Sequence, residues 1–260
     1  MGIIDLKSFA EGQWVGPTSG AVEILSAVTS EQVARGNSES LGFEAMVNYA
    51  REVGGTNLRK TTFHERAAML KGLAQYLNER REPLYQLSHE TGATMKDNLI
   101  DIDGGISTLF VYSSKGRREL PDGRVLSEGA AEVLARDGSF LGQHILTPLQ
   151  GVAVHINAFN FPVWGMLEKL APCLLAGVPA IVKPATATSY VTEACFRMII
   201  ESGILPEGAV QLVVGSLGNT LDLLGGQDVV SFTGSAATAQ ILRTNPNIIQ
   251  NSTRFIAEQD

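Results

Sequence analysis

Four short polar segments carry the side chains that could do chemistry in this chain of 260 residues. Each one follows a short apolar run rich in β-branched residues and precedes a helical pattern. The carboxyl ends of parallel strands meet at one edge of a sheet, so these segments should lie close together. They therefore predict a cleft that could bind a nucleotide. The segments are Asn157–Asn160, Lys183–Thr186, Gly215–Gly218 and Thr233–Ser235.

The segment Phe232-Thr233-Gly234-Ser235 is the best candidate for binding a phosphate group. It lies where a strand turns into a helix, so free backbone N–H groups and a hydroxyl could face an anion. The Gly-x-Gly-x-x-Gly pattern of ordinary dinucleotide folds is missing. Ser235 could equally serve only to cap the helix that begins at Ala236, and the residues alone leave both interpretations open.

Three charged residues stand at positions that a functional site could use. Lys183 ends a predicted strand, where a solvated lysine is the simpler interpretation. Lys169 lies in a helix that is apolar on nearly every side, so its ammonium must reach solvent or find a partner. Glu258 follows the apolar run Phe255–Ala257, and on its own it would ordinarily be a surface residue.

The two cysteines, Cys173 and Cys195, invite the hypothesis of a catalytic nucleophile. Neither has a histidine nearby in the sequence, or a helix N-terminus, that would lower the pKa of its thiol. A buried structural role is therefore favoured for both. The pair predicts no disulfide framework, and no metal site is expected.

The second half of the chain predicts an α/β fold. Its short apolar runs alternate with helical patterns, which is typical of a Rossmann-like parallel sheet with helices on both faces. The expected strands are Val152–Ile156, Ala180–Val182, Val210–Val214, Val229–Phe232 and a strand that begins at Phe255. The expected helices are 163–176, 190–202, 220–224 and 236–243.

The preceding residues divide into a helical part and a projecting hairpin. In the helical part, Thr62 and Glu65 have the spacing of a capping box, and a helix over 95–112 should be loosened at Gly104-Gly105. The next stretch is rich in glycine, proline and charge, which predicts two strands joined by turns. The expected division is a helical part at 1–118, an oligomerisation hairpin at 119–149 and a Rossmann-like core at 150–260.

Composition excludes several classes of partner. Hydrophobic residues make up 44% of the chain, enough for a large core, and the formal net charge is −7. An acidic surface argues against nucleic acid or an anionic membrane as the main partner. No apolar run approaches the ~18 residues of a membrane helix, and the N-terminus lacks the pattern of a signal peptide. A cytoplasmic location is therefore expected.

Four segments resemble the cofactor-binding half of the aldehyde dehydrogenase superfamily in order and spacing: Asn160–Pro162, Lys183-Pro184, Phe232–Ser235 and Glu258. The chain is most similar to a branch that acts on CoA-thioester semialdehydes in aerobic aromatic degradation. This branch includes the 3,4-dehydroadipyl-CoA semialdehyde dehydrogenases of the benzoyl-CoA pathway and the dehydrogenase half of the ring-opening enzyme of phenylacetate breakdown. The resemblance covers nearly the whole chain, through the segments GVAVHINAFNFP, GMLEKLAP, KPATAT, DVVSFTGSAAT and ERAAMLK.

The resemblance implies three catalytic roles. Asn160 would donate its amide to the oxyanion that forms when a thiolate attacks the aldehyde, with Phe159 and Phe161 keeping this amide fixed and dry. Glu258 would be the general base that activates the nucleophile or the deacylating water. Lys169 would belong to a proton path near that glutamate, which would explain its charge in an apolar helix.

The resemblance also implies a dinucleotide site. Lys183 would bind the adenosine ribose, and Thr186 stands where the family usually has a glutamate that chelates the ribose hydroxyls. A threonine can donate to a 2′-phosphate that a carboxylate would repel, so NADP is expected rather than NAD. The other expected cofactor-binding residues are Ile156 and Asn157 beside the nicotinamide, Gly215, Thr233, and Gly234 and Ser235 at the pyrophosphate.

The catalytic cysteine of the family would lie beyond Asp260, and neither Cys173 nor Cys195 matches its motif. The chain is therefore expected to be an N-terminal fragment, inactive alone, of an enzyme that oxidises a semialdehyde to the acid. The alternative is a truncated module that only binds nucleotide or associates with intact subunits. The missing glycine pattern and the Asn160 segment disfavour an ordinary Rossmann alcohol dehydrogenase. The family's hairpin implies a homodimer.

Overall fold

A seven-stranded sheet forms the centre of the protein, in a computed structural model that describes residues 2–260. Its strands are β2 (Ser8–Ala10), β3 (Gln13–Val15), β8 (Ala153–Ile156), β9 (Ala180–Lys183), β10 (Val210–Leu212), β11 (Val229–Gly234) and β12 (Arg254–Gln259). The strand order is β12-β11-β8-β9-β10-β2-β3, and the first five strands in this order run parallel. The predicted α/β fold with a parallel core is therefore confirmed.

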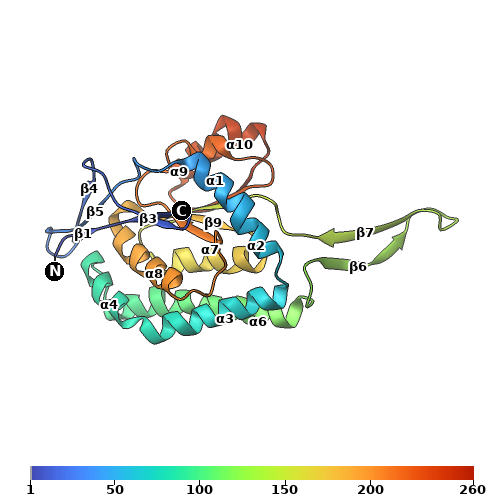
Figure 1. Cartoon of the computed structure of the whole chain (residues 1–260), viewed down its shortest axis with the longest axis horizontal. Helices are drawn as coiled ribbons and strands as arrows, with labels where there is room; N and C mark the ends of the chain where they lie inside the picture. Colours follow the sequence, from blue (N-terminus) through green and yellow to red (C-terminus); the bar gives the residue numbers. More distant parts are fainter. Residues whose placement is uncertain (1) are drawn as a thin grey trace.

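Helices cover both faces of this sheet, as Figure 1 shows. The principal helices are α1 (Phe43–Tyr49), α3 (Phe63–Arg80), α6 (Gly104–Glu119), α7 (Trp164–Leu175), α8 (Ser189–Glu201), α9 (Ala236–Arg243) and α10 (Pro246–Gln250). On one face α7 and α8 pack on the sheet, with α3 and α6 behind them. On the other face α1, α9 and α10 cover a separate apolar cluster. Burial on both faces explains why the central strands are continuous apolar runs.

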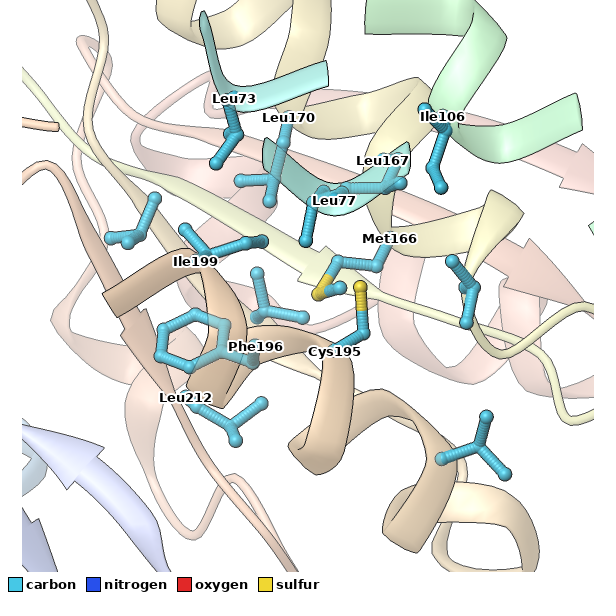
Figure 2. Close-up of a cluster of buried hydrophobic side chains, with 14 of the residues drawn as sticks. Leu73, Leu77, Ile106, Met166, Leu167, Leu170, Cys195, Phe196, Ile199 and Leu212 are labelled. Atoms are coloured by element: carbon cyan, nitrogen blue, oxygen red, sulfur yellow. The ribbon is translucent and has the colours of Figure 1, made fainter. Parts of the chain in front are cut away.

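The larger apolar core lies between the sheet and the helices α3, α6, α7 and α8 (Figure 2). Leu77 of α3, Leu170 of α7 and Phe196 of α8 are fully buried in it, and Cys195 packs beside them. Close packing of this kind holds each helix in one position on the sheet. The core therefore fixes the amino end of α7, which directly follows the Asn160 segment.

The prediction that residues 1–118 are helical is wrong for residues 4–36, which contain five short strands. β2 is antiparallel to β10, with Phe9 opposite Leu212, and its ring packs in a cluster with Trp14 and Phe196. Such short strands depend on contacts with a strand that is distant in the sequence, so no local pattern predicts them. The other three strands, β1 (Ile4–Asp5), β4 (Val22–Leu25) and β5 (Gln32–Gly36), form a separate sheet.

A π-helical turn, Leu99–Asp103, interrupts the helix that was predicted over residues 95–112. The irregular helical turn that was expected at Gly104-Gly105 is therefore present, but it lies directly before these two glycines. They let α6 approach α7 closely, because a Cβ on Gly104 would lie 2.3 Å from the Trp164 ring. The remaining helices of this part are α2 (Gly55–Arg59), α4 (Glu82–Ser88) and α5 (Met95–Asn98), with a π-helical turn at Ala50–Gly54 and a 3₁₀ turn at His89–Thr91.

Alanine should have opposite effects at two helical glycines. Gly104→Ala is expected to destabilise the chain by about 1–3 kcal/mol, because its methyl group would displace the Trp164 ring. Gly72→Ala in α3 is expected to stabilise the chain by about 0.5–1 kcal/mol, since its Cβ would make an ordinary contact with Ile204 at 3.5 Å and remove glycine entropy. Urea unfolding of both variants measures the difference, and shifts of the same sign would contradict this packing.

The predicted hairpin is present and projects from the body of the molecule (Figure 1). Its strands β6 (Leu126–Val133) and β7 (Leu141–Leu146) pair only with each other. Large apolar side chains on it, among them Val133, Phe140 and Ile145, are exposed. Within residues 2–260, no helix is both long enough and apolar enough to cross a membrane.

Candidate active site

The carboxyl ends of β8, β9, β11 and β12 lie side by side, as the sequence predicted. Ile156 at the end of β8 is paired with Lys183 of β9 and with Phe232 of β11, and Thr233 is paired with Glu258 of β12. The sheet register therefore brings the predicted cofactor-binding and catalytic residues to one edge. The Lys183 segment and the Asn160 segment each line a separate hollow along this edge.

The first hollow, which we call the Lys183 groove, has a volume of about 630 Å³. Four of the predicted cofactor-binding residues line it: Ile156, Lys183, Thr186 and Gly215. Burial lowers the pKa of the Lys183 ammonium. Lys183 is the one lysine or arginine that lines this groove within residues 2–260, so any phosphate bound here would meet its positive charge.

The opposite wall of the groove is the segment 36–39, which the sequence analysis missed. Ser38 in this segment donates its hydroxyl hydrogen to the Ser216 carbonyl at 2.7 Å. Gly215 has φ of +123°, and a Cβ there would lie 2.9 Å from Ser38, so the conformation and the close approach both require glycine. Gly215 could have indicated a close backbone contact, but the sequence does not show which segment makes that contact.

The turn Thr233-Gly234-Ser235 lies between β11 and α9. Ser235 caps α9, because its Oγ accepts a hydrogen bond from the Thr238 N–H at 3.3 Å. The capping interpretation is therefore confirmed. Ser235 is exposed. Phosphate binding by Gly234 and Ser235 stays a prediction. It is compatible with the capping role of Ser235, because other N–H groups at the start of a helix remain available to an anion.

Asn157, the first residue after β8, is buried with its amide side chain. Its backbone N–H donates to the Lys183 carbonyl at 3.0 Å, which ties the Asn160 segment to β9. Neither polar atom of the side chain has a hydrogen-bond partner among residues 2–260. A buried amide without partners is costly in a folded chain, so a polar ligand group is the expected partner. This observation fits a dinucleotide at the end of β8.

The second hollow, the Asn160 pocket, has a volume of about 390 Å³. It is lined by Asn160, Glu258 and Thr233, together with Trp164 and Glu168 of α7. The Thr233 hydroxyl donates to a Glu258 carboxylate oxygen at 3.2 Å. An amide donor and a carboxylate therefore line one space, where they could bind an oxyanion and accept a proton.

The expectation that aromatic rings keep the Asn160 amide dry is wrong. The flanking side chains are themselves exposed, Phe159 by 64% and Phe161 by 39%, and Asn160 is exposed with them. Thr188 and Thr192 bind the loop backbone at Phe159 and Pro162, and the Phe161 ring lies against the Trp164 ring with 6.3 Å between centroids. The three side chains therefore project from the tip of the loop, and their types alone did not indicate this direction.

Lys169 has the partner that its apolar helix required. Its ammonium lies 3.0 Å from a Glu168 carboxylate oxygen and 3.3 Å from the Gly165 carbonyl oxygen, with 9% of the side chain exposed. The other Glu168 oxygen accepts from the Trp164 indole N–H at 2.8 Å. Glu168 was not predicted, although a lysine in an apolar helix signals a nearby carboxylate.

Lys169, Glu168 and Glu258 also line an adjoining hollow of about 610 Å³ that contains His155. Burial, and then the charge of Lys169, lower the pKa of His155 to about 3. The imidazole is therefore neutral at ordinary pH, and Lys169 is the lysine that lines this hollow together with Glu258. This arrangement fits a proton path that uses lysine.

His155 should make the chain less stable in mild acid. Its pKa of about 3 in the folded chain lies below the ordinary 6.5, so the unfolded chain takes up the proton first. Its contribution is complete above pH 6.5 and falls by up to about 1.4 kcal/mol per pH unit as the pH drops toward 3. Urea unfolding from pH 7.5 to 4.5 should show that His155→Gln loses less stability than the parent chain. The control is His144→Gln, whose side chain in β7 is exposed; parallel profiles for His155→Gln and the parent would contradict the prediction.

Cys195 is buried, as predicted, whereas Cys173 is only half-buried and lines the hollow of about 610 Å³. Burial raises the pKa of the Cys173 thiol to about 12 and raises that of Cys195 as well, so neither is a thiolate at neutral pH. Both are free thiols. Within the part of the chain that the structure describes, no group of His, Cys, Asp or Glu residues could hold a metal ion.

Comparison with known proteins agrees with this geometry. The model of the aldehyde dehydrogenase family matches residues 14–259. A 3,4-dehydroadipyl-CoA semialdehyde dehydrogenase of Aromatoleum evansii is 42% identical over 98% of this chain and 50% of its own length. An alpha-ketoglutaric semialdehyde dehydrogenase of Bacillus subtilis is 30% identical over 90% of this chain and 47% of its own length.

Solved structures of the same family share the fold. Betaine aldehyde dehydrogenase of Staphylococcus aureus in complex with NAD+ has a TM-score of 0.81 and 22% identity, over 98% of this chain and 50% of its own. An E. coli NADP dependent enzyme also has a TM-score of 0.81 and 22% identity, over 98% of this chain and 52% of its own. The chain spans about half the length of the relatives it matches. By sequence and by fold, it belongs to the aldehyde dehydrogenase family.

Proposed function

We propose that this chain supplies the cofactor-binding half of an NADP-dependent dehydrogenase. The enzyme would oxidise a CoA-thioester-linked semialdehyde, of the 3,4-dehydroadipyl-CoA type, to the carboxylic acid in aerobic aromatic degradation. The observation that carries the proposal is that Asn160 and Glu258 line one pocket, beside the groove of Lys183 and Thr186, at the same sheet edge. The substrate class follows the similarity to the Aromatoleum evansii dehydrogenase.

The residues of this chain would act on the substrate side of the reaction. A cysteine thiolate from outside residues 1–260 would attack the aldehyde carbon, and the Asn160 amide would donate to the resulting oxyanion. Bound NADP supplies the acceptor for the hydride. Loss of the hydride would leave a thioester on that cysteine. Glu258 would then take a proton from the water that hydrolyses this enzyme thioester to the acid and the free cysteine, and Lys169 would relay the proton toward solvent. The Asn160 pocket is open enough for water to reach Glu258, which is exposed.

The residues along the sheet edge fit a dinucleotide. The Lys183 groove offers a lysine, a threonine hydroxyl and a glycine turn. In the sequence, the unpartnered Asn157 stands between Ile156, which lines this groove, and Asn160. Thr186 begins a 3₁₀ turn, Thr186–Thr188, directly after the Lys183-Pro184 segment. A hydroxyl at this position supports the choice of NADP over NAD, because it leaves room and a donor for a 2′-phosphate.

Calorimetry and a chimera test the proposal. The purified chain should bind NADP at one site and oxidise no aldehyde. Fusion to the second half of the Aromatoleum evansii dehydrogenase should restore oxidation, with a higher kcat/KM for the CoA-linked semialdehyde than for the free one. A chain that binds no dinucleotide would refute the proposal. Binding with an inactive chimera would favour the alternative, a module that only binds nucleotide or associates with subunits.

We propose further that the chain forms a homodimer through its hairpin. Exposed apolar side chains on both strands, and strand edges open to pairing, make this projection unfavourable in isolation. Light scattering should show a dimer that Ile145→Lys dissociates, while Ile241→Lys on the exposed face of α9 leaves it intact. A monomer at all concentrations would count against the hairpin as an interface.

A further inference from the structure

A buried carboxylate from another part of the chain holds the first turn of α7. Asp101 accepts hydrogen bonds from the Trp164 N–H at 2.7 Å and from the Val163 N–H at 3.1 and 3.3 Å. The first N–H groups of a helix have no partner within the helix, and an anion is favourable there. Val163 stands at the capping position and has no side-chain oxygen. Asp101, from the π-helical turn Leu99–Asp103, therefore replaces a local cap.

Two threonines from the α8 side bind the same loop from another direction. Thr188 donates its hydroxyl hydrogen to the Phe159 carbonyl at 3.0 Å, and Thr192 donates to the Pro162 carbonyl at 2.9 Å. These bonds and those of Asp101 hold backbone groups on both sides of Asn160. The side chain of Asn160 is therefore presented by a backbone that neighbouring elements fix, rather than by its own packing.

We propose that Asp101 is a positioning residue for Asn160, and that its negative charge keeps the Asn160 loop in the conformation that aims the amide into the Asn160 pocket. This proposal rests on the proposed function, because the direction of the Asn160 amide matters for catalysis only if that amide binds the oxyanion. Preorganised donors act without rearrangement at the moment of reaction, so a fixed backbone at this position is an advantage.

The charge state of Asp101 is adjustable. Burial raises its pKa to about 6, although the two N–H bonds oppose this shift. Asp97 of α5 lines a small hollow together with Asp101, and the charge of Asp101 adds to burial in raising the pKa of the Cys195 thiol of α8. At the start of α7, the Val163 and Trp164 N–H groups bind Asp101. On its own turn Asp103 is paired with Arg81. Asp101 makes no ion pair within residues 2–260, so a proton taken up near pH 6 would weaken its hold on the loop.

Ionised Asp101 also lowers the stability of the fold. Its pKa in the folded chain lies above the ordinary 3.8, so the folded chain takes up the proton first as the pH falls. The contribution of Asp101 to stability therefore grows as the pH drops from about 6 toward 4, and above pH 6 the buried charge is a cost. A fold that keeps a costly charge at this position agrees with a functional reason for it.

NMR of the isotopically labelled chain tests the coupling. Between pH 8 and 4.5, the backbone amides of Val163 and Trp164 should titrate with a midpoint near 6, which reports Asp101. Over the same range the order parameter of the Asn160 backbone amide should fall, and hydrogen exchange of the Val163 and Trp164 amides, which Asp101 binds, should accelerate at least about tenfold beyond the intrinsic pH effect. Asp101→Asn should show the mobile loop at every pH, and Asp101→Glu should restore part of the order.

The matched control is Asp97→Asn, an exposed carboxylate of the same hollow whose hydrogen bonds are to Thr94 at the start of its own helix, where an asparagine oxygen can still accept. It should leave the titration and the loop unchanged. An Asn160 amide that stays equally ordered while Val163 and Trp164 titrate would overturn the proposal, and this measurement needs no variant to fold. NADP binding, followed in the same samples at pH 8, tests the proposed function separately, because the Lys183 groove does not contain Asp101.

Discussion

Replacing Asn160 with alanine is expected to lower kcat for aldehyde oxidation by about 10²–10³, the usual effect of removing one oxyanion donor. The measurement uses the chimera described above, because residues 1–260 contain no reactive thiolate. The amide donates only once negative charge has formed on the aldehyde oxygen, so KM for the aldehyde should change little. The affinity for NADP should not change, since the Lys183 groove lies apart from Asn160.

Because Asn160 is exposed, this experiment can separate an effect on activity from an effect on stability. The variant should therefore unfold at nearly the same urea concentration as the parent. Asn219→Ala, at another exposed asparagine outside both hollows, is the matched control and should keep full activity. A loss of less than about threefold in Asn160→Ala would exclude the oxyanion role.

Thr186→Glu is expected to shift the cofactor preference from NADP toward NAD by about 10²–10³ in the ratio of the two dissociation constants. A carboxylate in this half-buried groove would repel a 2′-phosphate, and unit charges about 4 Å apart interact by about 4 kcal/mol at the effective dielectric of a protein surface. The same carboxylate could accept hydrogen bonds from both ribose hydroxyls of NAD. The ratio should therefore change because the affinity for NADP falls and the affinity for NAD rises.

Calorimetric titration of the unmodified chain and two variants separates charge from size. Thr186→Gln has the shape of the glutamate without its charge, so it should move the ratio far less than Thr186→Glu. Mild salt should weaken the repulsion, because the groove is open to solvent. A parent chain that prefers NAD, or equal ratios for the Gln and Glu variants, would show that Thr186 does not select the cofactor.

The sequence predicted the parts of the fold whose residues carry a strong local pattern. The parallel strands were visible because burial on both faces makes each one a continuous apolar run. The start of α3 was visible because Thr62 and Glu65 form a capping box, with the Thr62 hydroxyl 3.2 Å from the Glu65 N–H and the Glu65 carboxylate 2.7 Å from the Thr62 N–H. Such signals need only a few neighbouring residues.

Features that depend on distant partners were not predicted. The wall of the Lys183 groove at 36–39 comes from the other end of the chain, and nothing local indicates that Ser38 binds the Ser216 carbonyl. Asp101 reads as one acidic residue among several, and only the fold shows that it caps α7. The exposure of Asn160 depends on what covers its loop. The roles of the site residues, the dimer and the cytoplasmic location stay predictions.

The hairpin of β6 and β7 has a consequence for how the chain responds to dilution. A two-stranded ribbon alone is marginally stable in water, and within residues 2–260 these strands pair with no third strand, so the proposed dimer would stabilise them. Cleavage by a protease at the turn between Val133 and Leu141 should then accelerate as the protein is diluted, while the body with its two cores stays intact. The rate of cleavage in the hairpin would thus report the concentration of subunits.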